Sequence, residues 1–250
     1  MHQHPWQNGM ELLEDVLKNK NCISTGCEGI DTVLNGGLRK GQLTELAGPS
    51  SSGKTQVCLC TALHVADKEM GEVMFLDTGN SFSSKRIASM MEKEIRLERV
   101  MTRIFHQAVF DIFTMFTVLN DLCLNLRQEE ERNRERKLCL LIIDSISSLI
   151  TPILGGKNSN GWSMMVSIGF LLKKLAYEHN IAVLVTNHTV GGERGSSKPA
   201  LGESWKCIPH VRLFLSNDRE TYIRNVSVLK HTSVILGRSS TFMINDGWKI

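Results

Sequence analysis

The sequence predicts an α/β domain with a mostly parallel, twisted sheet, helices on both faces and an antiparallel edge near the C-terminal end. Helical and strand-like patterns alternate from Cys22 onward, as in a series of strand–helix–strand units. The apolar runs at residues 138–144 and 181–188 are typical of parallel strands that are buried on both faces. A glycine-rich segment at residues 48–55 separates a strand pattern from a helical pattern. The chain is therefore expected to repeat parallel crossover units.

The composition supports a folded domain. The chain has 250 residues, of which 42% are hydrophobic and 22% are charged, and this balance excludes a mostly disordered chain. The formal net charge is only +3, so any binding of nucleic acid must be local. Seven cysteines without a CxxC pair suit a reducing compartment, and no apolar run reaches the roughly 18 residues of a membrane span. We expect a soluble intracellular protein.

The first half of the chain has a clear order of elements. Residues 1–21 are expected to form a linker or lead-in helix, and residues 22–250 the domain itself. The domain begins with three strand patterns, at residues 41–48, 72–77 and 104–107. The helical patterns between and after them are at residues 55–68, 83–98 and 111–126, the last with Asp111 as its N-cap.

The second half continues the alternation after a charged stretch at residues 127–137, which is expected to be a solvated helix end and loop. One helix is expected at residues 162–179, between the two long apolar strands. Turn-forming residues predict loops at residues 151–161 and 190–205. The last strands, which form the sheet edge, are at residues 211–215, 224–231 and 240–246.

The most specific motif is GPSSSGKT, a complete match to GxxxxGK[ST]. Its glycines allow backbone N–H groups and the following helix N-terminus to face phosphate groups. Lys54 is expected to reach the β- and γ-phosphates of ATP, and the Thr55 hydroxyl to bind Mg²⁺. The predicted nucleotide-binding residues are Gly48, Pro49, Ser50, Ser51, Ser52, Gly53, Lys54, Thr55 and Gln56.

A phosphate-binding loop also needs a carboxylate on a neighbouring strand to hold Mg²⁺. Asp144 ends the apolar strand at residues 138–144 and is the preferred residue for this role, with Asp77 as its rival. The group that orients the attacking water is left open by the residue pattern. The candidates are Asp77, Glu45 and the polar strand end that includes His188.

These motifs occur in the order found in one known family. Residues 24–56 resemble the entry segment and phosphate-binding loop of the RecA-like recombinases of eukaryotes and archaea. Residues 140–150 resemble their Walker B strand, and residues 183–188 resemble the next strand, which leads into a DNA-binding loop. The resemblance covers residues 22–250. Finer features, at residues 56–60, 110–113, 152–156 and 198–205, are most similar to the D-type paralogue branch of the family.

The resemblance implies a nuclear protein of homologous recombination that binds ATP and Mg²⁺. It implies sibling paralogues in a heteromeric complex, the main recombinase and single-stranded DNA as partners, and no membrane. The DNA loops of the family match residues 155–161 and 190–203, where the candidate phosphate contacts are Lys157, Arg194 and Lys198. Trp162 and Trp205 flank these loops and are expected to be packing residues.

The sequence departs from the family pattern at three places. Gly79 stands where the recombinases have a water-activating glutamate, and His188 replaces a glutamine that senses the γ-phosphate. Residues 1–21 are too few for the family's small N-terminal helical domain, which we expect to be absent from this chain. Gly79 favours a nucleotide-gated mediator with weak DNA-stimulated ATPase activity. The alternative is an actively hydrolysing DNA-dependent ATPase or strand-exchange protein.

Overall fold

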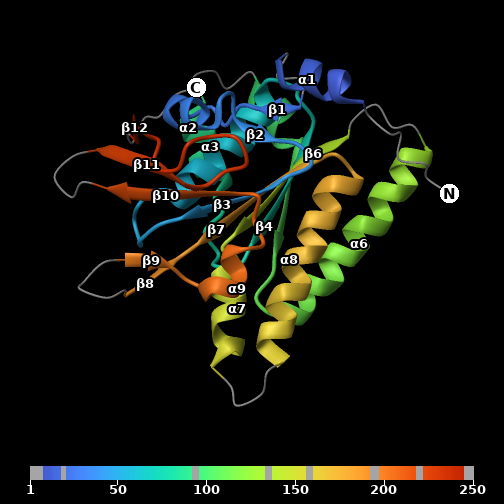
Figure 1. Ribbon diagram of the computed structural model, residues 1–250. Coiled ribbons are helices and arrows are strands. Elements are labelled where there is room, and N and C mark those ends of the chain that lie inside the picture. Colours follow the sequence, from blue (N-terminus) through green and yellow to red (C-terminus); the bar gives the residue numbers. More distant parts are fainter. Residues whose placement is uncertain are drawn as a thin grey trace.

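The computed structural model describes residues 8–17, 21–91, 96–132, 137–155, 160–191, 197–217 and 222–244. A central eight-stranded sheet consists of β3 (Leu43–Ala47), β4 (Glu72–Asp77), β5 (Ile104–Ala108), β6 (Leu138–Asp144), β7 (Ala182–Asn187), β10 (Val211–Asn217), β11 (Ile223–Lys230) and β12 (Ser239–Met243). Their order across the sheet is β12-β11-β10-β3-β7-β6-β4-β5 (Figure 1). The six strands from β10 to β5 in this order are parallel to one another, whereas β11 pairs antiparallel with both of its neighbours, β10 and β12. The predicted sheet and its antiparallel edge are confirmed.

Helices cover both faces of this sheet (Figure 1). One face packs against α2 (Glu28–Leu34), α3 (Lys54–Asp67), α4 (Ser84–Met90) and α5 (Leu97–Met101). The other face packs against α6 (Ile112–Glu131), α7 (Ile146–Leu154), α8 (Asn160–Glu178) and α9 (Gly202–Lys206). The strands have apolar side chains on both faces because each face meets a helical layer. None of the helices in the described ranges is both long and apolar enough to cross a membrane.

Short elements complete the chain. A first small sheet pairs β1 (Cys22–Ile23) with β2 (Leu38–Arg39), and a second pairs β8 (Thr189–Gly191) with β9 (Ser197–Pro199). Helix α1 (Gly9–Leu17) occupies part of the expected lead-in segment. It begins with a capping box, in which Asn8 Oδ1 accepts the N–H of Glu11 and Glu11 Oε2 accepts the N–H of Asn8.

Most predicted boundaries are confirmed within a few residues, and Asp111 caps α6 by accepting the N–H groups of Phe113 and Thr114. Three expectations are wrong. The single helix predicted at residues 83–98 is divided into α4 and α5, because the chain is extended at Met91 (φ −89°, ψ 135°). Both short helices bury apolar residues in the same core cluster, Ile87 and Met90 from α4 and Val100 from α5.

The other two errors concern loops. Residues 151–154 continue α7 despite Pro152, because Leu149 and Ile150 are buried against the sheet and burial outweighs the local turn preference. The segment predicted as a loop at residues 190–205 contains most of the β8–β9 hairpin and the short helix α9. Trp205 on α9 is fully buried, so packing gives this segment its structure.

Histidine 210 links β10 to β3 and makes the stability of the fold dependent on pH. Its Nδ1 accepts the backbone N–H of Leu43 at 2.9 Å, so the ring must be neutral there. Burial, with the nearby charges of Lys173 and Lys230, lowers the pKa of His210 to about 4. Between about pH 6.5 and pH 4, His210 is therefore protonated more in the unfolded chain than in the folded chain. Stability contributed by this contact is present above pH 6.5 and is lost as the pH falls through that window.

We expect His210→Asn, which keeps an acceptor for the Leu43 N–H, to reduce this pH dependence. The free energy of unfolding from urea denaturation is measured at pH 6.5 and pH 4.5 for both proteins. The drop between the two pH values is expected to be smaller in the variant by about 1 kcal/mol, because solvent screens part of the interaction of this half-buried ring. Other histidines with a lowered pKa are present in both proteins and cancel. Equal drops would show that His210 is not the titrating group.

Candidate nucleotide-binding site

The phosphate-binding loop lies between the end of β3 and the start of α3. Its backbone adopts left-handed conformations at Ser51 (φ 61°) and Gly53 (φ 102°), which turn the chain directly into the helix. No side chain caps the start of α3, and its first turn has no acidic residue. The N–H groups at this helix start are therefore available to an anion, and the helix dipole favours negative charge there.

A cavity of about 600 Å³ opens at this loop. Its lining consists of Ser50, Ser51, Gly53, Lys54, Thr55, Gln56, Arg86, Ser89, Met90, Asp144, His188, Arg224 and Ile244. Three lining residues are cationic and one is acidic, which suits a polyphosphate. The predicted residues Gly48, Pro49 and Ser52 are not among the lining residues. Gly48 is needed because a Cβ atom at this position would come within 2.5 Å of the Leu215 carbonyl oxygen.

Lysine 54 is held at the loop by two hydrogen bonds. Its Nζ donates to the carbonyl oxygens of Gly48 at 2.7 Å and Pro49 at 2.8 Å. Burial lowers the pKa of Lys54, and the charge of Asp144 opposes this shift. The amino group thus lies beside the loop that is predicted to surround the phosphates.

The structure brings Thr55 and Asp144 together across 89 positions of sequence. The Thr55 hydroxyl donates to Asp144 Oδ2 at 2.6 Å. Ser81 Oγ donates to the same oxygen at 3.1 Å, and Thr186 Oγ1 donates to Oδ1. A hydroxyl and a carboxylate are the protein ligands that P-loop proteins use for Mg²⁺. The residues present therefore fit this ion, with Thr55 and Asp144 to hold it.

Asp77, the other candidate for holding Mg²⁺, has its carboxylate in a different position from that of Asp144. It is paired in register with Asp144 across β4 and β6, but its carboxylate is directed into its own loop. It accepts the backbone N–H of Phe82 at 2.8 Å and of Gly79 at 3.0 Å, and the hydroxyl of Ser81 at 3.2 Å. Burial opposes its charge, but these hydrogen bonds outweigh burial and lower the pKa of Asp77. Asp77 shapes the loop at residues 77–82 and does not line the cavity.

Histidine 188 lines the cavity just after β7. Its backbone N–H donates to Ser147 Oγ at 3.0 Å, which fixes the start of the segment that follows β7. Burial and the charge of Lys54 lower the pKa of His188, while the charge of Asp144 opposes them. The ring is therefore neutral near pH 7 and has one N–H group to donate.

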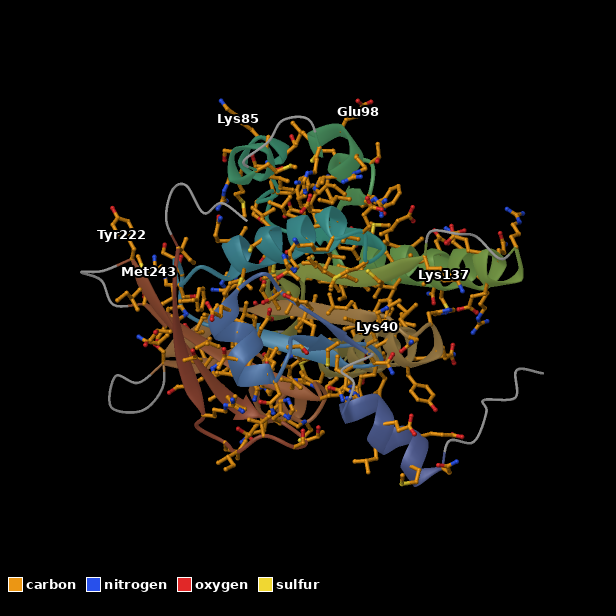
Figure 2. The ribbon with its side chains drawn as sticks, turned by 90° about the horizontal axis from the view of Figure 1, so that it is seen from above. Lys40, Lys85, Glu98, Lys137, Tyr222 and Met243 are labelled. Carbon is orange, nitrogen blue, oxygen red and sulfur yellow. The ribbon has the colours of Figure 1, made fainter. Side chains whose placement is uncertain are left out.

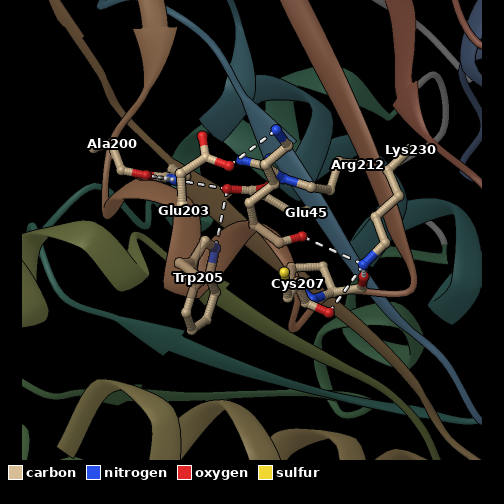
Figure 3. Close-up of polar contacts among 10 residues, drawn as sticks. Glu45, Ala200, Glu203, Trp205, Cys207, Arg212 and Lys230 are labelled. Carbon is tan, nitrogen blue, oxygen red and sulfur yellow. Dashed lines mark hydrogen bonds and ion pairs between the residues drawn. The ribbon is translucent and has the colours of Figure 1, made fainter. Parts of the chain in front are cut away.

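Glutamate 45, another candidate for orienting water, has a structural position instead. It is fully buried in β3 and accepts hydrogen bonds from Arg212 Nε, from Asn187 Nδ2 at 2.6 Å and from Trp205 Nε1 at 3.1 Å (Figure 3). Asn187 also donates to the Ala200 carbonyl oxygen at 3.0 Å. Glu45 thus joins β3, β7, β10 and α9, and it does not line the cavity.

Sequence reasoning missed the residues that complete the cavity from α4, from β11 and from the segment just after β12. Arg86 and Met90 on α4 each contact the side chain of Gln56, through the Gln56 Oε1 and Nε2 atoms. Arg224 on β11 and Ile244, just after β12, reach the loop from the antiparallel edge. Ile244 lies so near that a Cβ atom on Gly53 would come within 2.4 Å of its Cδ1. The GxxxxGK[ST] motif carries no signal for these contacts, because they depend on how the edge strands fold back.

The DNA candidates are only partly described. Lys157 and Arg194 lie outside the described residues. Lys198 lies on β9, is exposed and pairs with Val190 of β8. Trp205 is a packing residue as expected, whereas Trp162 is 41% exposed.

The sheet order, the phosphate-binding loop after β3 and the acid at the end of β6 define a RecA-like α/β core of the P-loop class. The chain belongs to the Rad51 family, whose family model matches residues 17–224. The expected membership in the eukaryotic RecA-like recombinase family is confirmed.

The relatives support the expected branch. DNA repair protein RAD51 homolog 4 of Bos taurus is 36% identical, over 86% of this chain and 67% of its own length. The Mus musculus protein of the same name is 34% identical, over 83% of this chain and 64% of its own length. A probable RAD51 homolog 4 of Dictyostelium discoideum is 29% identical, over 96% of this chain and 79% of its own. Within this family of DNA repair and recombination proteins, the chain is thus similar to the D-type paralogues, and it spans about two thirds of the length of its mammalian relatives.

Proposed function

We propose that this chain is an ATP-binding subunit of a nuclear, heteromeric complex of recombinase paralogues. In this role it helps to load the main recombinase on single-stranded DNA during homologous recombination. Bound ATP shapes the contact with a sibling subunit and is hydrolysed only slowly. The family membership supports the repair and recombination setting, and the names of the relatives support the role of a paralogue.

One observation carries the proposal of slow hydrolysis. Of the described residues that line the cavity, Asp144 is the only acid, and its carboxylate already accepts the hydroxyl groups of Thr55 and Thr186. A carboxylate committed to Mg²⁺ does not also orient the attacking water, and Gly79 offers no side chain for that task. Positioning and charge stabilisation are nearly all that a protein contributes to phosphoryl transfer, so the loss of one positioning group slows turnover.

The cavity residues have distinct tasks in this proposal. Lys54 and the N–H groups at the start of α3 bind the phosphates, and Arg86 adds positive charge beside Gln56. Thr55 and Asp144 hold Mg²⁺, which neutralises phosphate charge when bound. The neutral ring of His188 donates one hydrogen bond toward the nucleotide. Lys198, with Lys157 and Arg194, is proposed to contact DNA phosphates weakly, so that binding is salt-sensitive and depends on the assembly.

The proposal is tested by ATP turnover of the chain bound to its sibling, with and without single-stranded DNA. We expect slow turnover in the natural protein and a gain of at least about tenfold in Gly79→Glu, since one positioned acid or base contributes roughly 10²–10⁴-fold. The substitution is sterically permitted, because a Cβ atom on Gly79 meets nothing within 4 Å. Gly79→Gln is the matched control: it has the same size without the carboxylate, and we expect no gain.

Lys54→Ala in this chain, with the sibling intact, separates the activity of this subunit from that of its partner. Fast DNA-stimulated turnover that disappears in Lys54→Ala would make the chain an actively hydrolysing ATPase and overturn the mediator role. A folded, ATP-bound Gly79→Glu without any gain would show that the absent acid does not limit the rate.

A further inference from the structure

A second cluster of ligating side chains lies far from the nucleotide cavity. Cys123 on α6 meets Glu178 and His179 at the end of α8, and one potential ligand atom from each lies within 4.8 Å of the others. Helices α6 and α8 run side by side (Figure 1), and His179 lies three residues before Ala182, the amino end of β7. The nucleotide cavity lies at the opposite, carboxyl ends of the parallel strands. The cluster therefore has no part in the proposed ATP chemistry.

The thiol and the imidazole already have the spacing of two ligands on one zinc ion. Cys123 Sγ and His179 Nε2 are 3.8 Å apart. Zinc bonds of about 2.3 Å to sulfur and 2.0–2.1 Å to nitrogen, at a tetrahedral angle, place the two ligand atoms about 3.6 Å apart. Cys123 is buried, and the His179 side chain is only 3% exposed, so both groups are held in place by packing.

A carboxylate orients the histidine ring. His179 Nδ1 lies 2.8 Å from Glu130 Oε1, where an N–H group at Nδ1 donates to the carboxylate. This places the lone pair on Nε2, which faces the Cys123 sulfur. Histidines that bind metals in proteins almost always donate their other ring N–H group in this way, and the carboxylate also makes the ligand nitrogen more basic.

The third ligand comes from Glu178, and its surroundings limit the strength of the site. Its carboxylate is 3.3 Å from Arg127 and 3.8 Å from Lys174, so these cations compete with a metal for it. Glu178 and His179 also line a cavity of about 680 Å³, which gives a path for an ion and a fourth, water ligand. One thiolate, one imidazole and one carboxylate are ligands that suit Zn²⁺. They do not suit Mg²⁺ or Ca²⁺, which prefer oxygen ligands alone.

We propose that Cys123, Glu178 and His179 form a binding site for a zinc-class divalent cation, with Glu130 as the positioning residue of His179. The ion joins the middle of α6 to the end of α8, and thus clamps the helical layer that covers one face of the sheet. Binding stabilises the folded chain because the unfolded chain does not hold the three ligands together.

The probe is Co²⁺, titrated into the full chain after treatment with a chelator and in the presence of a phosphine reductant. We expect a thiolate-to-cobalt charge-transfer absorption that saturates at one ion per chain and is abolished when Zn²⁺ displaces the cobalt. In Cys123→Ser the absorption should disappear, whereas in Cys207→Ser, which removes an exposed thiol elsewhere, it should be unchanged. Zn²⁺ at about a hundredfold excess over its Kd should raise Tm by roughly 5–10 °C in the natural protein and in Cys207→Ser, but not in Cys123→Ser.

Glu130→Gln keeps the test decisive if Cys123→Ser does not fold. Glu130 is partly exposed, so the variant is expected to fold, retain the absorption and bind Co²⁺ roughly 10–100-fold more weakly. Absence of a charge-transfer absorption in the natural protein, or its persistence in folded Cys123→Ser, would overturn the proposal. Unchanged affinity in Glu130→Gln would overturn the role given to that residue.

Discussion

Replacement of Glu45 with alanine is expected to lower the free energy of unfolding by about 3–5 kcal/mol, because it leaves a buried charge without its partner. The Arg212 side chain is 6% exposed and donates through Nε to Glu45. Asn187 and Trp205 lose the same acceptor, and each buried donor left unsatisfied has its own desolvation cost. Urea denaturation at pH 7 measures the difference.

Glu203→Ala is the matched control for this prediction. Glu203 also pairs with a cation, Lys206, at 3.0 Å, but its side chain is 86% exposed. Exposed ion pairs contribute at most about 1 kcal/mol, so this variant should be close to the natural protein in stability. A loss below 1 kcal/mol in Glu45→Ala would mean that the buried group relaxes or takes up water when the carboxylate is removed.

Lys54→Ala is expected to weaken ATP binding by roughly 100-fold, within the range measured when one partner of a buried charge pair is truncated. Lys54 is the cation that the phosphate-binding loop itself holds, with both hydrogen bonds to loop carbonyl oxygens. Calorimetric titration of ATP into the folded variant measures the change. Association with the sibling paralogue should weaken in parallel if ATP shapes that contact, and co-purification at limiting ATP tests this.

Lys137→Ala removes the same charge at a distance and is the control. Figure 2 shows Lys137 at the end of the molecule away from Tyr222 and Met243, which neighbour the cavity residues Arg224 and Ile244. It should bind ATP like the natural protein. Unchanged affinity in Lys54→Ala would contradict the assignment of the cavity, and lost affinity with unchanged co-purification would contradict the nucleotide-gated contact alone.

The local sequence pattern was sufficient to predict those elements that depend on residues close together along the chain. The phosphate-binding loop was predicted because glycine positions, lysine and threonine must follow one another along the chain to surround a phosphate. Asp144 was preferred over Asp77 because it ends an apolar strand at the proper distance downstream of the phosphate-binding loop. In the structure Asp144 accepts the Thr55 hydroxyl, while the hydrogen bonds of Asp77 hold its own loop. The magnesium role of Asp144 stays a prediction.

Other features depend on contacts between segments that are distant in sequence. The α4–α5 division and the extension of α7 past Thr151 follow from which side chains are buried on the sheet, and local turn preferences do not record burial. Glu45 was a candidate for orienting water because a carboxylate on a strand looks the same in sequence whether it faces a cavity or a buried arginine. Arg212 lies 167 positions away, and only the pairing of β3 with β10 brings the two together.

The sequence by itself determined the parallel α/β class, the phosphate-binding loop motif and the family, because these depend on short ordered motifs and on the period of apolar residues. The tertiary structure alone decided that Arg86, Arg224 and Ile244 complete the cavity and that Glu45 is structural. It also decided that Cys123 meets His179. Each of these contacts joins elements whose relative position is set by sheet order and helix packing. Sheet order and helix packing depend on the whole chain, so no single segment of sequence predicts them.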